Sequence, residues 1–423
     1  MSTLEPAMLA GSPHLAAHEH LVGSTIGIAL KHFRDIMYLA RKARNIFAGG
    51  WMAKHSELGV EEGFFDRPRA SSQIKQRIVV DYFLAWANVL ARDRAVGYAD
   101  LFAGPGKYKS GDKSIPLLVA ERVVQDERLR QCVKLWFNEG DGDLARELDK
   151  NLKDVDGLGA LTHTPRITKR VIDKRLASHQ FSIPTFILAD PCGYKGLSLR
   201  LISNALQGFG NDCLFFFNYR RVNMKLSYPV MDESVDEFFE SDRAQALRRE
   251  IASLNPRARE KAVLEAIRTA IKEAGGIPIV FAFRSGEGGG TSHHLVFASK
   301  HPKGARIMKN IMHKFSSEVI DGIASWDYDP RDEQTPQTGL LFSPLDEVCD
   351  RLLQVFAGRT VNFQQLLDEE AQQQFTDSNY RDAVLRLEEE FRVDVDPPAL
   401  NRRMQTGGTK RTLPENTRLT FPT

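Results

Sequence analysis

The sequence predicts an α/β protein with a doubly wound, mostly parallel sheet, followed by a small helical domain with a wing. Three observations lead to this prediction. Between residues 71 and 330, short apolar runs alternate with helix-length segments, which is the pattern of β-α-β units. The last two apolar runs are joined only by SGEGGGTSH, too short for a crossover helix, so they should form a terminal antiparallel hairpin. Beyond residue 330, three helical segments precede two short extended ones.

Residues 1–70 are predicted to be an N-terminal arm and one amphipathic helix. The first 25 or so residues show no strong periodicity. Lys31–Phe47 then alternates apolar and basic positions at helical spacing, with Phe33 and Ile36 on the inner face and Arg34 and Arg41 on the outer one. The basic face is compatible with phosphate contact or with solvent.

Residues 71–330 are predicted to form the α/β domain. It begins with the helix IKQRIVVDYFLAWANVL and a strand that ends in the turn of YADLFAGPGKY. The further predicted strands are Val133–Phe137, Thr185–Ala189, Cys213–Asn218, Ile277–Phe283 and His294–Ser299. The helices between them include Leu199–Gly208 and Ala258–Ala274.

Residues 331–423 are predicted to form a winged-helix-like domain after the polar linker DYDPRDEQTPQTG. Its helices are Leu345–Phe356, Phe363–Glu370 and Ser378–Phe391, and extended pieces around Val393 and Leu419 flank the wing. Residues 331–400 carry 6 basic and 15 acidic side chains, so phosphates should repel the third helix. Only the wing is basic, through Arg402, Arg403, Lys410 and Arg411. We therefore expect this domain to dock another protein or to touch nucleic acid through its wing alone.

Composition excludes several classes of protein. The 423 residues carry a net charge of +2 and 42% hydrophobic residues, which excludes collagen-like, coiled-coil and wholly disordered chains. The four cysteines, Cys132, Cys192, Cys213 and Cys349, form no CxxC pair, which argues against a zinc knuckle or a disulfide framework. No run approaches the roughly 18 apolar residues of a membrane helix. We expect a cytoplasmic protein that does not contact membranes; its oligomeric state is not predicted.

Three strand ends carry the candidate site. The first strand is followed by Asp100-Leu101-Phe102-Ala103-Gly104-Pro105-Gly106, where the glycines let the backbone approach a ligand. It matches neither GxGxxG nor the P-loop, which disfavours dinucleotides and nucleoside triphosphates. Glu139 follows the next strand, where a carboxylate can bind both ribose hydroxyls of an adenosyl group, and Asp190-Pro191-Cys192-Gly193-Tyr194 follows a later buried strand.

Each acid also has a plain structural explanation. Asp100 can cap a helix, Glu139 can be a surface acid, and Asp190 can begin a tight turn. Their joint placement instead matches an S-adenosylmethionine-dependent methyltransferase core, with Asp100, Phe102, Gly104, Gly106 and Glu139 binding the cofactor.

The chain also resembles a known family. The segments KQRIVVDYFLAWANVL, YADLFAGPGKYKSG with the following SIPLLVA, FILADPCGYKGLSL, LFFFNYRRV and HHLVFASKHPKGARIMKNIM are similar to those of the three-Cys-motif partner family, bacterial proteins with a methyltransferase-like core. The resemblance spans about residues 74–314. It implies a protein partner that carries a three-cysteine motif. The family usually has an aromatic residue where this chain has Cys192.

Asp190 and Tyr194 are the candidate catalytic residues. The Asp-Pro segment is similar to motifs of enzymes that methylate exocyclic amines of guanine or adenine. Asp190 can accept the amine protons and orient the nitrogen, while Tyr194 either stacks on a flipped base or packs under the sheet. Cys192 is either a nucleophile for pyrimidine C5 methylation or a buried turn cysteine.

Other polar residues receive simpler interpretations. The adjacent His293 and His294 should point to opposite faces of a strand, so we expect a role at the hairpin edge rather than a shared metal. Arg220 and Arg221 are candidates for phosphate contact, and Lys107 and Lys109 are candidates for phosphate contact or for solvent.

Two hypotheses about function remain from the sequence. The first is a methyltransferase that acts on RNA or DNA at an exocyclic base amine. The second is a methyltransferase-like scaffold that no longer catalyses transfer and binds a three-Cys-motif protein.

Overall fold

The computed structural model describes residues 66–92, 94–170, 180–191, 196–226, 233–285, 290–320, 323–329, 344–405 and 411–423. The chain separates into two compact units, residues 1–62 and 63–423, and the structure below is that of the second unit. The helix predicted at Lys31–Phe47 lies outside the described residues.

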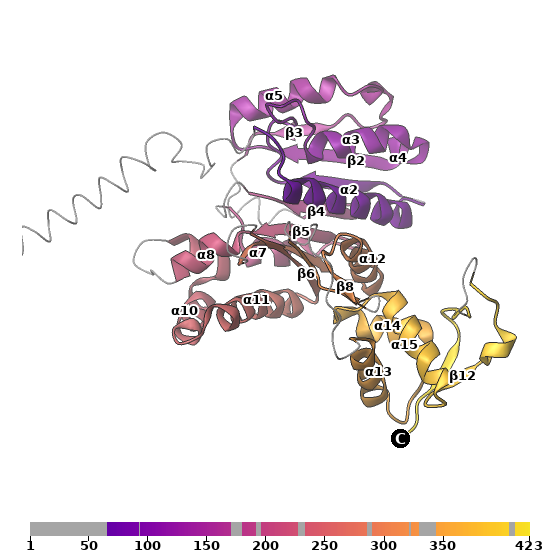
Figure 1. Ribbon diagram of the computed structural model, residues 1–423. Coiled ribbons are helices and arrows are strands. Elements are labelled where there is room, and N and C mark those ends of the chain that lie inside the picture. The colour runs from indigo at the N-terminus through magenta and orange to yellow at the C-terminus, as the bar shows by residue number, and fades with distance from the viewer. Residues whose placement is uncertain are drawn as a thin grey trace, which may run out of the picture. The chain divides into compact units, whose positions relative to one another are not determined.

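An eight-stranded sheet forms the centre of the α/β domain (Figure 1). Its strand order is β10-β6-β7-β5-β4-β1-β2-β3, and of these strands only β7 runs antiparallel to its neighbours. The strands are β1 (Val96–Asp100), β2 (Val133–Asn138), β3 (Arg166–Thr168), β4 (Thr185–Ala189), β5 (Asp212–Phe217), β6 (Ile277–Arg284), β7 (Thr291–Ser299) and β10 (Asp327–Tyr328). The predicted doubly wound, Rossmann-like sheet with a terminal antiparallel hairpin is thus confirmed.

Helices cover both faces of this sheet. The helices of the α/β domain are α2 (Ala70–Leu90), α3 (Ile115–Gln125), α4 (Glu127–Cys132), α5 (Gly142–Lys153), α7 (Leu199–Ala205), α8 (Tyr219–Leu226), α9 (Glu233–Phe239), α10 (Ser241–Ile251), α11 (Pro256–Glu273) and α12 (Pro302–His313). A 3₁₀ turn, Leu158–Ala160, precedes β3, and a small hairpin pairs β8 (Val319–Ile320) with β9 (Ile323–Ala324).

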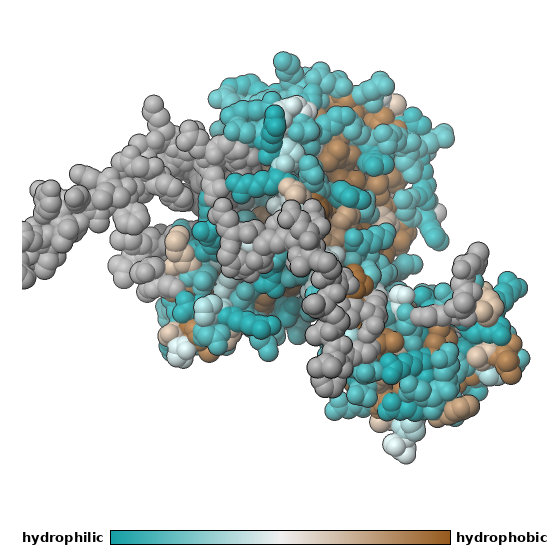
Figure 2. All heavy atoms as spheres, in the orientation of Figure 1, coloured by the Kyte–Doolittle hydropathy of each residue, from teal (hydrophilic) through white to brown (hydrophobic). Residues whose placement is uncertain are grey.

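Alternation along the buried strands creates two separate cores. Leu214 of β5 belongs to the core that includes residues of α2, α3, α5 and α12, whereas its neighbours Cys213 and Phe215 belong to the core that includes residues of α7 to α11. Successive strand residues point to opposite faces, so a strand that is apolar at every position contributes side chains to the cores on both faces of the sheet. Figure 2 shows hydrophilic side chains over most of one face, with hydrophobic ones gathered over α2 and α3.

The C-terminal domain has the predicted winged-helix arrangement. Its helices are α13 (Pro344–Val355), α14 (Phe363–Glu369) with a 3₁₀ turn at Glu370–Gln372, α15 (Asp377–Glu389) and a 3₁₀ turn at Ala399–Asn401. Its strands β11 (Thr360–Asn362), β12 (Asp394–Asp396) and β13 (Arg418–Thr420) form one antiparallel sheet in the order β11-β13-β12. Asn362 and Thr376 each begin a helix with a capping box, which fixes the starts of α14 and α15.

Several details differ from the sequence prediction. Asp327 and Tyr328, expected in the linker, form β10 and extend the large sheet beside β6. The wing sheet has a third strand, β11, whose three residues are too few to show a period. The histidine pair does not lie at a hairpin edge, because β7 is paired on both sides, by β5 and β6.

Candidate functional site

The three predicted acids lie at one edge of the sheet. Strands β4, β1 and β2 are adjacent and parallel, so their carboxyl ends meet. Asp100 is the last residue of β1, Glu139 directly follows β2, and Asp190 directly follows β4. In an open α/β sheet this is the edge at which ligands bind.

The loop after β1 depends on its glycines. Gly104 and Gly106 have φ values of +65° and +83°, a backbone conformation that glycine adopts without steric cost. A Cβ on Gly106 would lie 2.3 Å from Leu117 Cδ1 and 2.9 Å from Leu148 Cδ1. Asn151 Nδ2 donates to the Pro105 carbonyl at 2.7 Å, which ties the loop to α5.

Glu139 connects the second strand end to this loop. Its Oε2 accepts the Gly104 N–H at 2.8 Å, and its Oε1 accepts the Asp141 N–H at 2.9 Å. Each carboxylate oxygen can accept a further hydrogen bond, so the half-buried group retains acceptor capacity for a ligand hydroxyl.

Asp100 is buried beneath the loop. Its Oδ1 accepts the Phe102 N–H at 3.1 Å. Burial raises the pKa of the Asp100 carboxyl to about 8, and the nearby carboxylates of Asp190 and Glu139 add to the rise. At neutral pH the Asp100 carboxyl is therefore mostly protonated.

Asp190 has a partner that the sequence analysis missed. Lys75 of α2 donates from Nζ to Asp190 Oδ2 at 2.5 Å, and both side chains are largely buried. The same ammonium group lies 4.4 Å from the centre of the Phe216 ring. The sequence does contain a sign that Lys75 is buried. Lys75 lies at helical spacing from Ile78, Val79 and Tyr82, which form the buried face of α2.

The two histidines lie on opposite faces of β7, as predicted. The His293 ring stacks on Phe216 with centroids 4.6 Å apart, on the side of Lys75. Burial lowers the pKa of His293 to about 3, and the cations of Lys75 and Arg221 add to the effect. His294 Nε2 lies instead 3.1 Å from Glu260 Oε1 of α11. Burial lowers the pKa of His294 as well, although the neighbouring Glu260 carboxylate acts to raise it.

The remaining candidates have other partners, lie on α8, or fall outside the residues that the structure describes. Lys107 pairs with Asp154 at 3.4 Å and Lys109 with Asp66 at 2.9 Å, so both have carboxylate partners. Arg220 is exposed and Arg221 half-buried on α8, directly after β5. Cys192 and Tyr194 lie outside the described residues.

Metal and membrane sites are not evident in the part of the chain that the structure describes. There, no group of three or more His, Cys, Asp and Glu side chains is placed to hold a metal ion. Nor does any described helix combine the length and apolar content needed to cross a membrane.

The acidic C-terminal domain contacts α12 of the α/β domain. Arg306, whose side chain is 9% exposed, lies 2.7 Å from Asp377, 3.3 Å from Asp368 and 3.2 Å from Glu415. Lys309 donates to the Gln373 carbonyl at 3.0 Å. Burial lowers the pKa of Lys309 to about 8 although Asp377 opposes the shift.

The wing is less basic than its sequence indicates. Arg402 is buried and pairs with Glu388, so it does not present its charge to a ligand. Arg403 is exposed, Arg411 donates to the Arg402 carbonyl at 2.9 Å, and Lys410 lies outside the described residues.

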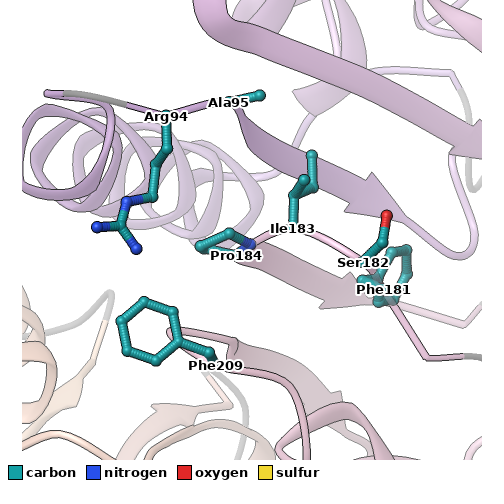
Figure 3. A pocket seen from close by; sticks show the side chains of 7 residues that line it. All are labelled: Arg94, Ala95, Phe181, Ser182, Ile183, Pro184 and Phe209. Carbon is teal, nitrogen blue, oxygen red and sulfur yellow. The ribbon is translucent and has the colours of Figure 1, made fainter.

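A shallow cavity of about 310 Å³ lies at the opposite edge of the sheet, beside the starts of β1, β4 and β5 (Figure 3). The Arg94 guanidinium lies 5.4 Å from the ring centre of the exposed Phe209. The lining residues are Arg94, Ala95, Phe181, Ser182, Ile183, Pro184 and Phe209. The three acids lie at the other edge, so this cavity is separate from the candidate site.

Comparisons with known proteins give a family match for part of the chain and several solved structures of low identity. Residues 327–399 match the model of the GMT-like wHTH domain family. Solved structures similar to the chain include the CurJ carbon methyltransferase, at 13% identity and a TM-score of 0.33, with 53% of each chain covered. The chain thus spans about half the length of that protein.

Two further solved structures are similar at the same low level. The methyltransferase domain of bacterial CtHen1-C has 11% identity and a TM-score of 0.30, over 53% of this chain and 98% of that one. The plantazolicin methyltransferase BpumL in complex with SAH has 12% identity and a TM-score of 0.31, over 54% of this chain and 85% of that one. No curated protein sequence matches the chain.

Proposed function

We propose that the chain is an S-adenosylmethionine-dependent methyltransferase that acts on an exocyclic base amine of RNA or DNA. The observation that carries this proposal is the meeting of Asp100, Glu139 and Asp190 at three adjacent strand ends, around a loop that requires glycine. Each acid alone has a structural explanation, whereas the set reproduces the polar requirements of one ligand.

The residues at this edge fit the proposed cofactor. Glu139 keeps acceptor capacity for the two ribose hydroxyls, and Gly104 brings its backbone beside that carboxylate. We propose that Asp100, buried beneath the loop, favours the cationic methionine part through its charge, and that the half-buried Phe102 lines the cofactor site. When bound, S-adenosylmethionine supplies an electrophilic methyl group, which passes to the amine nitrogen with release of S-adenosylhomocysteine and a proton.

Asp190 is proposed to bind the substrate amine. Its carboxylate accepts an N–H of the amine, which orients the nitrogen lone pair, and it can take up the proton that leaves after transfer. No covalent enzyme intermediate is needed. We propose Tyr194 as the residue that stacks on the base.

Charge supports a polyanionic substrate at the α/β domain. Residues 71–330 carry 38 basic and 32 acidic side chains, whereas residues 331–400 carry 6 and 15. Arg220 and Arg221 follow β5 at the same edge as Asp190 and are proposed to contact phosphates.

Calorimetric titration with S-adenosylmethionine and S-adenosylhomocysteine tests the cofactor. We expect both to bind; folded protein that binds neither would refute the proposal. Transfer of labelled methyl groups to total RNA and DNA then tests the substrate. Asp190→Ala should preserve cofactor binding and abolish transfer, and an unchanged transfer rate would reject the role of Asp190.

A second candidate function is that of a scaffold for a three-Cys-motif protein. The observation that favours it is the charge of the C-terminal domain. Residues 331–400 are acidic, and Arg402 of the wing is buried in a pair with Glu388, which suits a protein partner better than a nucleic-acid duplex. Cofactor binding without transfer to any nucleic acid, together with capture of a three-Cys-motif protein, would favour this candidate.

A further inference from the structure

The Lys75–Asp190 pair is a largely buried ion pair at the candidate site. A lysine ammonium is rarely buried without a partner, because it loses hydration. The Lys75 side chain is 11% exposed and the Asp190 side chain 19%, with 2.5 Å between Nζ and Oδ2. The Phe216 ring on the next strand gives the ammonium a second favourable contact.

Lys75 is held in place by a rigid helix. Ile78, Val79 and Tyr82, one and two turns further along α2, are completely buried against the sheet. Tyr82 also donates to Asp212 Oδ2 at 2.5 Å, at the start of β5. A side chain carried on such a helix can fix the position of the group it contacts.

The acidic groups around Asp190 explain why a cation is favourable beside it. Asp190 shares its edge of the sheet with the carboxyl groups of Asp100 and Glu139, and Asp190 and Glu139 both help to raise the pKa of Asp100. The Lys75 cation stabilises the Asp190 carboxylate in this acidic surrounding. Lys75 donates to Oδ2, and each oxygen of a carboxylate can accept more than one hydrogen bond, so the Asp190 carboxylate retains acceptor capacity for a ligand.

We propose that Lys75 is a positioning residue for methyl transfer, which anchors Asp190 through Oδ2 so that Oδ1 receives the substrate amine. The inference rests on the proposed function. Lys75 does not touch the substrate; it acts through Asp190.

Kinetics of full-length variants test this role. Lys75→Met should lower kcat for methyl transfer about 100-fold, the loss typical of a misplaced reacting group, and leave the KM for S-adenosylmethionine unchanged. Lys75→Arg, which keeps the cation, should recover part of the rate. Arg77→Met is the matched control, because Arg77 is exposed on the same helix and contacts Phe315 instead. A parallel loss of cofactor affinity and thermal stability in Lys75→Met, with full rate in Lys75→Arg, would show a packing role and overturn the inference.

A second measurement does not depend on activity. In protein labelled with ¹⁵N at the lysine Nζ, the buried Lys75 ammonium should give a slowly exchanging NMR signal, identified by its loss in Lys75→Arg. We expect Asp190→Asn to shift or broaden this signal. If the signal is unmoved, the ion pair is absent and the inference fails; if it responds but the wild type transfers no methyl group, the proposed function fails while the pair stands.

Discussion

At the scale of single residues, Asp100 should make the proposed cofactor binding depend on pH. Its pKa of about 8 leaves the carboxyl mostly protonated at pH 7, because burial and two neighbouring carboxylates disfavour the charged form. A cationic ligand favours the carboxylate, so binding must expel the proton. Affinity for S-adenosylmethionine should therefore rise as pH increases towards 8.

Calorimetry at pH 7 in buffers of different ionisation enthalpy measures that proton directly. We expect close to one proton released per cofactor bound by the wild type. In Asp100→Asn the release should disappear. A wild-type binding enthalpy that is independent of the buffer would contradict the assignment of Asp100.

Gly106 offers a test of the loop. Gly106→Ala combines an unfavourable φ of +83° with a collision against Leu117 and Leu148, so we expect a loss of about 3 kcal/mol in stability and loss of cofactor binding. Gly111→Ala is the control, because φ there is +91° and no atom lies within 4 Å of the added Cβ. Thermal unfolding should show a much smaller change for Gly111→Ala; equal changes would mean that the collision is unimportant.

Sequence reasoning located the three acids but not Lys75, which pairs with Asp190. Asp100, Glu139 and Asp190 follow apolar runs, and the ends of apolar runs can be recognised. Lys75 precedes any strand and has the residue type of a solvated helix face. Only its position on the buried stripe of α2 distinguishes it, and its pairing with a residue 115 positions away depends on tertiary structure.

At the scale of elements, long periodic segments were predictable and short ones were not. The limits of β2, β4 and β6 agree with prediction to within one residue. The strands β3, β10 and β11 have only two or three residues, fewer than a repeating pattern needs. They form because a neighbouring strand offers unpaired backbone groups, which no local pattern reveals.

Helix α12 carries a test of the contact between the domains. Arg306→Gln leaves Asp377, Asp368 and Glu415 without their common cation, so we expect stability to fall by about 2 kcal/mol. Hydrogen exchange should accelerate in α14 and α15. Arg359→Gln, which breaks an exposed pair with Glu369, should have little effect in the same assay. Similar exchange in the two variants would show that the α12 contact does not stabilise the C-terminal domain.

At the scale of the whole molecule, the net charge of +2 conceals a division between domains. If nucleic acid binds to the α/β domain, exposed arginines there should govern the salt dependence of binding. Arg220→Ala should weaken binding to RNA or DNA and reduce the slope of log affinity against log salt by about 1. Arg403→Ala, on the wing, should change neither quantity. The opposite pattern would place the nucleic acid on the wing.

One helix joins the two edges of the large sheet. Lys75 contacts the carboxyl end of β4, while Tyr82 and Trp86 of the same helix contact Asp212 and Gly210, at the amino end of β5. Because α2 has contacts at both ends, it cannot shift along its axis without breaking one of them. A loss of packing near Tyr82, far from the carboxylates, should thus reach Asp190 as a shift of a whole helix. Under the proposed function, the same surface of α2 both packs the interior and holds Asp190 in position.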